Sequence, residues 1–296
     1  MASRSFVPRA ILGLYTETSL HCGTESGSGY VDMPIQRERH SGFPMIPGST
    51  IKGVLNDEGK WGPADRAYFF GSDEKPPANP GDPKTPGRPG SVSFGDAFLV
   101  AFPVRSSRYP FVWITCPIIL ERTYRALGRP WPKDVKRLKE GEAWSATEGS
   151  EVLLEELQVS ATRDGASILE PLTALLLQSP ELAYTRGIFQ ERLYAISDED
   201  FSKLIETATE IVTRIRIDEK SGTTSQGDGQ LFNEELVPRD TLFLSVLREL
   251  NGSKPEFRVH DIPPVIRLGG HETIGRGVTW VNRVPLGNGK AQEEPQ

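Results

Sequence analysis

The sequence predicts an α+β fold, in which one sheet-based domain spans residues 1–296 and carries an inserted middle region. With 296 residues, of which 37% are hydrophobic, the chain is long and apolar enough to bury a substantial core. Strand-like patterns are interleaved with few helical patterns, and no internal repeat is visible. An acidic stretch over residues 141–210 interrupts these patterns and is interpreted as the insertion.

The first third of the chain predicts a strand, a long polar loop and a short helix. Residues 9–19 alternate between apolar and polar side chains, which is the period of a half-buried strand. The glycine-rich loop that follows ends at Ser49, a residue type that favours a helix N-cap, so a short helix is expected over 49–57. Residues 71–90 are rich in proline and glycine and predict a flexible surface loop.

In the middle of the chain the sequence predicts two strands and a helix. The hydrophobic pattern after them is unclear. Strands are expected over 91–104 and 111–116, and Pro117 can open a helix because proline fits the first helical position. Residues 130–165 are expected to be irregular, since they mix charged and glycine-containing stretches. Residues 166–196 combine an apolar run with polar turns.

The last third predicts one helix and several strands. Ser197, followed three residues later by Asp200, resembles a capping box and is expected to open a helix over 198–211. The expected strands cover 212–218, 231–236, 241–250 and the end of a glycine-containing segment at 266–284, with a loop at 221–230.

Composition narrows the class of protein. No stretch approaches the roughly 20 apolar residues of a membrane helix, and the N-terminus lacks the pattern of a signal peptide. Two cysteines, Cys22 and Cys116, cannot build a disulfide framework or a four-cysteine zinc site, and they are expected to be reduced thiols. We therefore expect a cytoplasmic protein without a membrane partner.

The charge is segregated along the chain. The net charge of −6 argues against a simple nucleic-acid binder. Residues 141–210, however, hold fourteen acidic and four basic residues, so the rest of the chain has an excess of basic residues. Such segregation allows one face to meet phosphate while another is acidic, although scattered surface charge is an equally simple interpretation.

A polar segment over residues 29–53 is the first candidate functional site. Arg37, Arg39 and Lys52 are suited to phosphate oxygens, and Lys52 lies near an expected helix N-terminus that also attracts anions. Asp32 is suited to hold a divalent metal or to orient a nucleophile. The alternative, which spacing alone does not exclude, is that Arg37 and Glu38 form salt bridges and Asp32 caps a turn.

A glycine-rich segment, GGHETIGRG at residues 269–277, is the second candidate. Its four glycines allow a backbone to approach a ligand closely and to offer N–H groups to phosphate. The segment lacks the spacing of a Walker A motif or of a dinucleotide-binding fingerprint, and nothing else implies a nicotinamide, flavin or nucleotide cofactor. A plain tight turn is the alternative.

Histidine and glutamate residues give weaker signals. The four histidines, His21, His40, His260 and His271, have no HExxH spacing, so a zinc site is not expected. His21 is suited to proton transfer, or is a hydrogen-bonding loop residue. Glu234 and Glu235 occupy successive strand positions and point to opposite faces, so at most one reaches a given site; a solvated edge charge is the alternative.

Several of these segments together resemble a known family. Residues 14–53 resemble the N-terminal signature of RAMP-superfamily CRISPR proteins and, more narrowly, of the backbone nuclease subunit of the type III-B (Cmr) effector complex, whose loop has the form VDxPIQRExxTGxPxIPGSSLKG. This chain has GSTIKG where GSSLKG is commoner, and Cys22 lies where relatives vary. Further matches follow in family order at 91–106, 111–120, 206–218, 231–243 and 268–277.

The resemblance implies a ferredoxin-like (RRM-like) RAMP palm with a thumb insertion, which we place at about residues 150–200. It implies that several copies stack along a CRISPR guide RNA, together with other Cmr effector subunits. It also implies cleavage of complementary target RNA at regular intervals by a metal-dependent endoribonuclease that uses a divalent metal, Mg²⁺ or Mn²⁺. A flipped nucleotide would place its 2′-hydroxyl in line with the phosphate, and base pairing would read the sequence.

The resemblance also implies roles for individual residues. Asp32 matches the catalytic and metal-binding aspartate, and His21, Glu234 and Glu235 match its neighbours. The positions that match guide-contacting regions are Arg37, Arg39, Lys52, Arg267, Gly269, Gly270, Gly275, Arg276 and Gly277. Two alternatives remain: a purely structural guide-RNA-binding filament subunit, and a stand-alone enzyme that processes precursor guide RNA, against which the lack of a histidine dyad argues.

Overall fold

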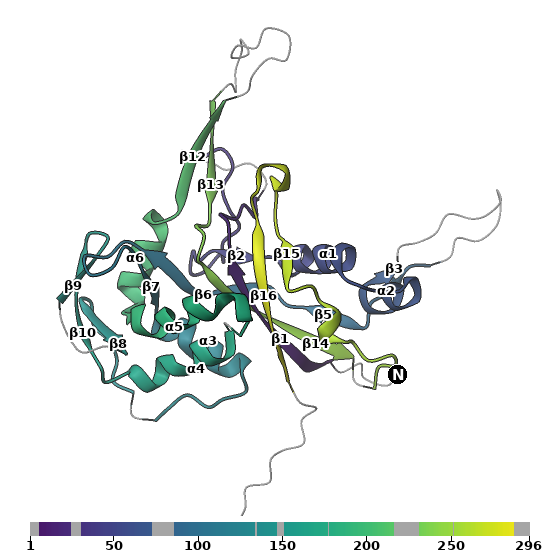
Figure 1. Cartoon of the computed structure of the whole chain (residues 1–296), viewed down its shortest axis with the longest axis horizontal. Coiled ribbons are helices and arrows are strands. Elements are labelled where there is room, and N and C mark those ends of the chain that lie inside the picture. Colours follow the sequence, from purple (N-terminus) through teal and green to yellow (C-terminus); the bar gives the residue numbers. More distant parts are fainter. Residues whose placement is uncertain are drawn as a thin grey trace, which may run out of the picture.

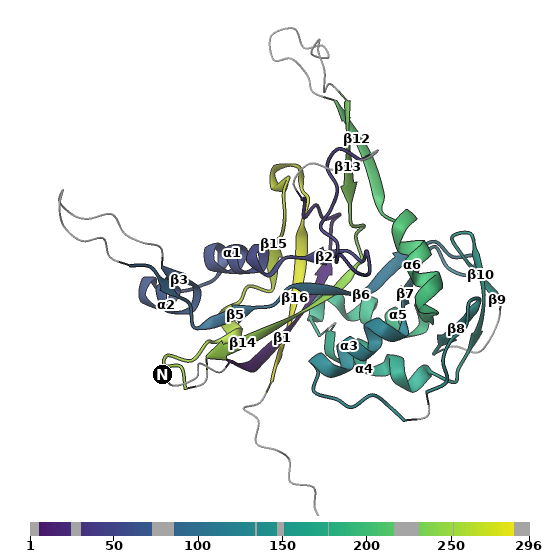
Figure 2. The ribbon, with the colours of Figure 1, turned by 180° about the vertical axis from the view of Figure 1, so that it is seen from behind.

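Figure 1 shows a computed structural model of the chain, which describes residues 6–24, 31–72, 86–133, 135–146, 151–176, 178–215, 231–250 and 252–286. Helices α3 to α6 lie at one end of the molecule, and helices α1 and α2 lie at the other, as the view from behind confirms (Figures 1 and 2). A large mixed sheet connects the two ends, and a two-stranded hairpin projects from the body. Among the described helices, none is long and apolar enough to cross a bilayer.

Within the described residues the main sheet has twelve strands. Ten of them follow the order β15, β16, β1, β14, β6, β7, β11, β8, β10 and β9, and β2 pairs with β6 and β5 with β14 at its side. Their bounds are β1 Phe6–Thr16, β2 Met45–Ile46, β5 Val92–Phe94, β6 Ala97–Val104, β7 Val112–Thr115, β8 Glu142–Ser145, β9 Glu151–Leu154, β10 Leu157–Thr162, β11 Leu193–Ile196, β14 Leu242–Leu250, β15 Val265–Arg267 and β16 Val278–Pro285.

Strand β1 is the centre of the fold. The alternating pattern predicted a strand here, and the structure shows that it pairs antiparallel with β14 on one side and with β16 on the other. Its side chains serve two cores: Ala10, Leu12 and Leu14 belong to one hydrophobic cluster, and Ile11 and Tyr15 to the other. Successive strand residues point to opposite faces, so both faces of this strand are covered. The half-buried strand expected from alternation is therefore buried on both sides.

The helices are α1 Gly48–Glu58, α2 Pro63–Phe70, α3 Pro117–Ala126, α4 Ala166–Leu176, α5 Ala183–Arg192 and α6 Asp198–Thr207, with short 3₁₀ turns at Pro180–Leu182, Val259–Asp261 and Glu272–Ile274. Two predicted helix starts are confirmed. Pro117 opens α3, and the Ser197 side chain accepts a hydrogen bond of 3.1 Å from the Asp200 N–H at the start of α6.

The predicted N-cap at Ser49 is wrong, because α1 begins one residue earlier. Pro47 holds the cap position and has no side-chain hydrogen bond to the helix. The Gly48 N–H donates to the Asp96 carboxylate at 2.7 Å, which anchors the first turn to the β5–β6 connection. A Cβ at Gly48 would lie 2.3 Å from the Phe94 carbonyl oxygen, so only glycine allows this close approach.

The prediction that residues 130–165 are irregular is also wrong. Strands β8, β9 and β10 lie there, and β8 pairs parallel with β10 and antiparallel with β11. Each is short, so no alternating pattern is long enough to be recognised locally. The segment at 150–200, where a thumb was predicted, contributes β9, β10 and β11 to the main sheet as well as helices α4 and α5.

Two small hairpins complete the fold. Strands β12 Glu210–Ile215 and β13 Leu231–Leu236 form the projecting hairpin in Figure 1. Strands β3 Gly71–Ser72 and β4 Arg88–Pro89 pair at the base of the predicted surface loop, of which residues 73–85 lie outside the described residues. The predicted loop at 221–230 also lies outside them.

Both cysteines are free and buried, as expected of reduced structural thiols. Burial raises the pKa of the Cys22 thiol to about 12, so it is protonated at neutral pH. Because the thiolate is the reactive form, the Cys22 thiol is unreactive at neutral pH. This holds although Cys22 lies on the segment that leads to the candidate site.

Candidate functional site

Asp32 lies beside strand β13, on the segment that follows β1. The backbone N–H groups of Asp32 and Met33 both donate to the Asn233 carbonyl at 3.1 Å. In return, the Asn233 N–H donates to Asp32 Oδ2 at 2.8 Å. The side chain is exposed, and Oδ1 has no hydrogen bond from the described residues. The structure therefore fixes the direction of this carboxylate and leaves one of its oxygens open to solvent.

Glu235 holds the same segment from the buried side of the hairpin. Its carboxylate pairs with the Arg37 guanidinium, and it accepts from the Thr209 hydroxyl at 2.9 Å and from the Ile35 N–H at 3.1 Å. Arg37 also donates to the Gly42 carbonyl at 2.7 Å. The salt-bridge interpretation of Arg37 is confirmed, because its guanidinium binds protein groups at both ends.

Replacement of Glu235 by glutamine is expected to lower the free energy of unfolding by about 3 kcal/mol, because the new amide must turn its NH₂ group toward Arg37 or toward the Ile35 N–H. Chemical denaturation measures this change. Glu121→Gln is the matched control, since Glu121 forms an exposed pair with Arg125 and should change stability by less than about 0.5 kcal/mol. Equal losses in the two variants would show that Glu235 is no more important than a surface charge.

Glu234 points the other way and is fully buried, at 0% exposure. Its Oε2 lies 2.7 Å from Arg214 Nε, and its Oε1 lies 2.8 Å from His271 Nε2 and 3.8 Å from His21 Nδ1. Despite these short distances, neither oxygen has a contact with hydrogen-bond geometry. The predicted divergence of the two glutamates is confirmed by their different partners, whereas the solvated edge charge is wrong because both are buried.

His21 connects the two glutamates. Its side chain is 5% exposed, and Nδ1 lies 2.8 Å from the Glu235 carbonyl oxygen. A carbonyl only accepts hydrogen bonds, so in the neutral ring the proton is on Nδ1. The imidazole rings of His21 and His271 are 5.6 Å apart between centroids. The structure thus brings together two histidines that are 250 positions apart in the sequence.

His271 is the residue that the sequence analysis did not include in the site. Its only signal in the sequence is its place in the glycine-rich segment. Its backbone has φ of 64°, a left-handed conformation that is uncommon for a residue with a side chain. Together with Glu234 and His21 it forms a cluster in which one nitrogen or oxygen atom of each side chain lies within 4.8 Å of those of the other two.

Several backbone N–H groups of the glycine-rich segment already donate hydrogen bonds within the protein. The N–H groups of Gly270 and Gly277 donate to His21 and Ser19 carbonyls at 2.9 and 3.1 Å, and the Gly275 N–H donates to Glu272 at 2.9 Å. These three amides are therefore not free for phosphate, which favours the tight-turn interpretation. Arg267 pairs with Glu272 at 3.4 Å, whereas Arg276 has no ion pair among the described residues.

The remaining predicted cations lie at the surface. Arg39 and Lys52 are exposed, and neither has an ion pair within the described part of the chain. Lys52 and Arg88 line a cavity of about 360 Å³ between α1 and the β3–β4 hairpin. Among the described residues no carboxylate contributes to this lining, so their charge suits an anion.

Comparison of the chain with known protein families gives a match. Residues 14–278 match the model of the RAMP superfamily.

The chain belongs to the RAMP superfamily.

Three relatives of this RAMP protein are informative. The chain is 33% identical to the CRISPR system Cmr endoribonuclease Cmr4 of Pyrococcus furiosus, over 92% of this chain and 94% of the relative. It is similar to the crystal structure of oligomeric Cmr4 from the same organism, with 28% identity, a TM-score of 0.68 and coverage of 95% of this chain and 100% of the other.

The third relative supports the fold alone. A chain in the cryo-EM structure of type III-B Cmr-beta bound to cognate target RNA has a TM-score of 0.70 at 20% identity, with coverage of 94% of this chain and 98% of that chain. The two chains therefore share the fold of the mixed sheet and its helices at low sequence identity.

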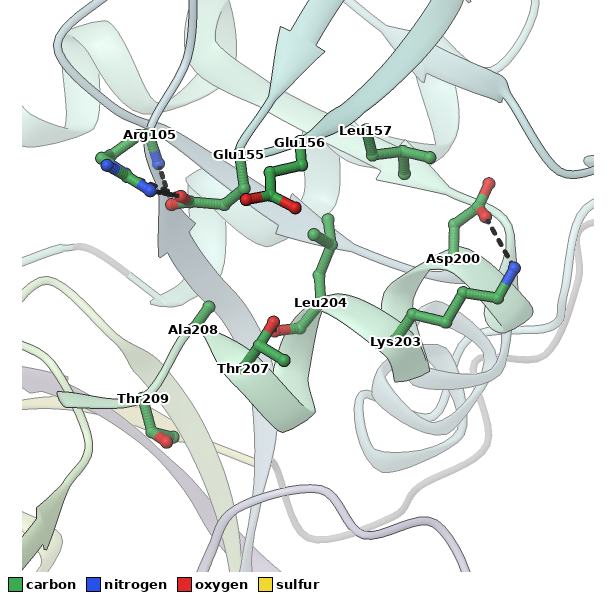
Figure 3. Close-up of a pocket in the computed structure, with 10 residues that line it drawn as sticks. All are labelled: Arg105, Glu155, Glu156, Leu157, Asp200, Lys203, Leu204, Thr207, Ala208 and Thr209. Carbon is green, nitrogen blue, oxygen red and sulfur yellow. Dashed lines mark hydrogen bonds and ion pairs between the residues drawn. The ribbon is translucent and has the colours of Figure 1, made fainter. Parts of the chain in front are cut away.

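A larger cavity in this RAMP protein, of about 580 Å³, lies next to the candidate site (Figure 3). Most of its charges are already matched within its own lining: Arg105 pairs with Glu155, and Lys203 lies 3.6 Å from Asp200. Thr209 is also part of the cavity lining, and its hydroxyl donates to Glu235, which connects the cavity to the candidate site. Such a lining has no excess of positive charge and is not suited to phosphate.

Proposed function

We propose that this RAMP protein is a backbone subunit of a type III-B CRISPR effector complex. In this role it would bind guide RNA as one of several stacked copies, beside other Cmr subunits, and cleave complementary target RNA. The observation that carries the proposal is the similarity to the Pyrococcus furiosus Cmr endoribonuclease over nearly the full length of both chains. The similarity to oligomeric Cmr4 supports the stacked arrangement. A cytoplasmic location follows from this role.

Asp32 is the proposed cleavage residue. One oxygen is held by the Asn233 N–H, so the exposed second oxygen has a fixed direction toward solvent. A target RNA whose 2′-hydroxyl lies in line with the adjacent phosphate needs only such a positioned group and charge stabilisation. Glu234 lies in β13, the strand that holds Asp32, and His21 contacts the same strand; both would support the site from the buried side.

The proposed divalent metal, Mg²⁺ or Mn²⁺, would be held by Asp32. The residues fit in part: Mg²⁺ commonly binds one or two protein carboxylates and completes its shell with water and substrate phosphate oxygens. Asp32 supplies one carboxylate with one open oxygen, and RNA would supply the others. When bound there, the ion would stabilise the negative charge that develops on the cleaved phosphate.

Cations at the surface are proposed to hold the RNA backbone: Arg39 and Lys52 are exposed, and Arg276 is half-buried. Arg39, Lys52 and Arg276 are the predicted contacts that have no carboxylate partner among the described residues. Arg88 joins Lys52 in the cavity beside α1 and adds a contact that the sequence analysis did not predict. Arg37 and the glycines of the 269–277 segment would position the RNA-binding surface from within, since their polar groups already bind protein atoms.

Replacement of Lys52 by alanine is expected to weaken guide-RNA binding several-fold and to reduce the magnitude of the slope of log K against log salt by about 0.7, because one phosphate contact to a single strand is lost. Titration of a short guide RNA at several salt concentrations measures both. Lys136→Ala removes the same charge from the exposed segment after α3 and should leave the slope unchanged. An unchanged slope in Lys52→Ala would exclude a phosphate contact.

The palm and the thumb remain proposals. Strands β1, β14, β16 and β6 would form the ferredoxin-like palm, because they make the continuous antiparallel centre of the sheet. A thumb at about 150–200 would use the lobe of β9, β10 and α4. The β12–β13 hairpin is a second candidate, favoured by its projection from the body (Figures 1 and 2) and by its exposed side chains Ile211, Ile215 and Leu231.

A purely structural filament subunit is the alternative function. The observation that favours it is the Asp32–Asn233 hydrogen bond, which is the turn-capping role that a non-catalytic aspartate would have. In that case cleavage would be done by another subunit, and removal of divalent ions would leave the pattern of products unchanged.

A further inference from the structure

Strand β13, which directs Asp32, carries a buried carboxylate at the next position along the chain. The N–H groups of Asp32 and Met33 donate to the Asn233 carbonyl, and the Asn233 N–H donates to Asp32 Oδ2 at 2.8 Å. The direction of the Asp32 carboxylate therefore depends on where β13 lies at residue 233. Glu234 follows directly, is fully buried and points toward the 269–277 segment.

His271 is the residue of the 269–277 segment that meets this carboxylate. Its Nε2 lies 2.8 Å from Glu234 Oε1, and Arg214 Nε lies 2.7 Å from Oε2. A carboxylate oxygen offers only lone pairs, so the imidazole faces it with a proton on Nε2. Arg214 belongs to β12 and moves with the hairpin, whereas His271 belongs to the connection between β15 and β16. The His271 contact therefore ties β13 to the end of the main sheet.

The backbone around His271 is itself fixed. The His271 carbonyl accepts from the Ile274 and Arg276 N–H groups at 3.2 and 3.3 Å, and the Gly270 N–H donates to the His21 carbonyl at 2.9 Å. The φ of His271 is 64°, a left-handed conformation that a residue with a side chain keeps where its surroundings impose it. These contacts give the imidazole a defined place, against which β13 can be held.

We propose that His271 is a positioning residue for Asp32. By holding Glu234 from the 269–277 segment, the imidazole fixes β13 beside Asn233, whose N–H sets the direction of the Asp32 carboxylate. The expected effect on rate rests on the proposed cleavage role of Asp32, whereas the expected effect on the Asp32 segment does not. Because His271 acts through Glu234 and β13, its ring needs no contact with the RNA and transfers no proton.

Loss of this contact should change the rate of cleavage rather than the affinity for RNA. In complex assembled with guide RNA and partner subunits, His271→Ala is expected to lower single-turnover cleavage at saturating target RNA by about 10- to 100-fold, since a misplacement of about 1 Å has effects of this size. Target affinity should change less than about 2-fold, because the proposed phosphate contacts are other residues.

A conservative variant separates a positioning imidazole from one that transfers a proton. The amide of His271→Gln reaches the same point as Nε2 and offers an N–H group to Glu234, so the rate should return to within about 3-fold of that of the unchanged chain. An amide cannot replace an imidazole in proton transfer. A rate in His271→Gln as low as in His271→Ala would overturn the proposal.

A double-mutant cycle tests whether His271 acts through Asp32. His271→Ala in an Asp32→Asn background should lower the residual rate by less than about 2-fold, because the charge that His271 positions is already absent. A loss by the same factor in both backgrounds would show that His271 acts independently of Asp32 and would overturn the proposal, as would a normal rate in folded His271→Ala.

Amide hydrogen exchange of the purified full chain tests the same inference without cleavage. His271→Ala is expected to speed exchange at least about 10-fold within residues 31–36 and 231–237 and to leave β7 and β11 unchanged, whereas a general loss of stability would raise exchange throughout. His260→Ala removes an exposed imidazole from another loop and should exchange and cleave as the unchanged chain does.

The two kinds of measurement separate this inference from the proposed function. If the unchanged complex fails to cleave, or if Asp32→Asn cleaves normally, the proposed function fails, and exchange alone then decides whether His271 positions the Asp32 segment. Unchanged exchange within residues 31–36 and 231–237 in His271→Ala would overturn the inference whatever the cleavage assay shows.

Discussion

Replacement of Asp32 by asparagine is expected to reduce cleavage of target RNA at least about 100-fold in the assembled complex, while RNA binding is retained. The physical reason is that asparagine keeps an oxygen to accept the Asn233 N–H but loses the negative charge on the exposed side. The segment should therefore stay in place, and only the ability to bind a cation or to accept a proton is removed. Labelled target RNA, added to chain assembled with guide RNA and partner subunits, gives the rate.

Two further measurements make the Asp32 result specific. Asp164→Asn changes the charge by the same amount at an exposed position before α4 and should cleave at the normal rate. Titration of the unchanged complex with Mg²⁺ or Mn²⁺ after chelation should restore cleavage in proportion to ion binding. Normal cleavage by Asp32→Asn would exclude Asp32 as the cleavage residue and would leave the structural-subunit alternative in place.

Replacement of Gly269 by alanine is expected to destabilise the protein by more than about 3 kcal/mol, or to displace the 269–277 segment from the site. Gly269 has φ of 79°, and a Cβ there would lie 2.2 Å from the His21 carbonyl oxygen. That oxygen is fixed, because it accepts from the Gly270 N–H at 2.9 Å. The clash is with backbone, so no side-chain rotation can relieve it. Thermal and chemical unfolding measure the loss.

Gly275 provides the matched control for this substitution. It has the same φ of 79° in the same segment, but a Cβ there would meet nothing within 4 Å. Gly275→Ala should therefore show only the cost of a left-handed alanine, about 1–2 kcal/mol. The difference between the two variants isolates the close approach of Gly269 to His21. If both lose the same stability, the backbone contact contributes nothing and the segment moves freely.

Several elements could be predicted from the sequence because their signals are local. Strand β1 follows from its alternation, α3 from Pro117 and the start of α6 from the Ser197 side chain. The order of the family segments also predicted the RAMP superfamily, which the match over residues 14–278 confirms. For the strand and the two helix starts, the determining groups lie within a few residues of one another, so the neighbouring chain alone fixes the conformation.

The strands in the middle of the chain could not be predicted in this way. Strand β8 has four residues and is stabilised by pairing with β10 and β11, which lie well beyond it in the chain. The start of α1 likewise depends on Asp96, which is 48 residues away from Gly48. Pairing energy of this kind comes from partners that no local window contains.

The candidate site also combines features that the sequence predicts with features that only the tertiary structure sets. The sequence by itself predicted Asp32, His21 and the two glutamates as site residues, and it predicted that Glu234 and Glu235 diverge along a strand. Only the tertiary structure decided that Glu235 binds Arg37, that Asp32 keeps one open oxygen, and that His271 joins His21 at Glu234. Spacing rules detect groups on one helix or loop. His21, Glu234 and His271 meet because the segment after β1, strand β13 and the 269–277 segment converge in the folded chain.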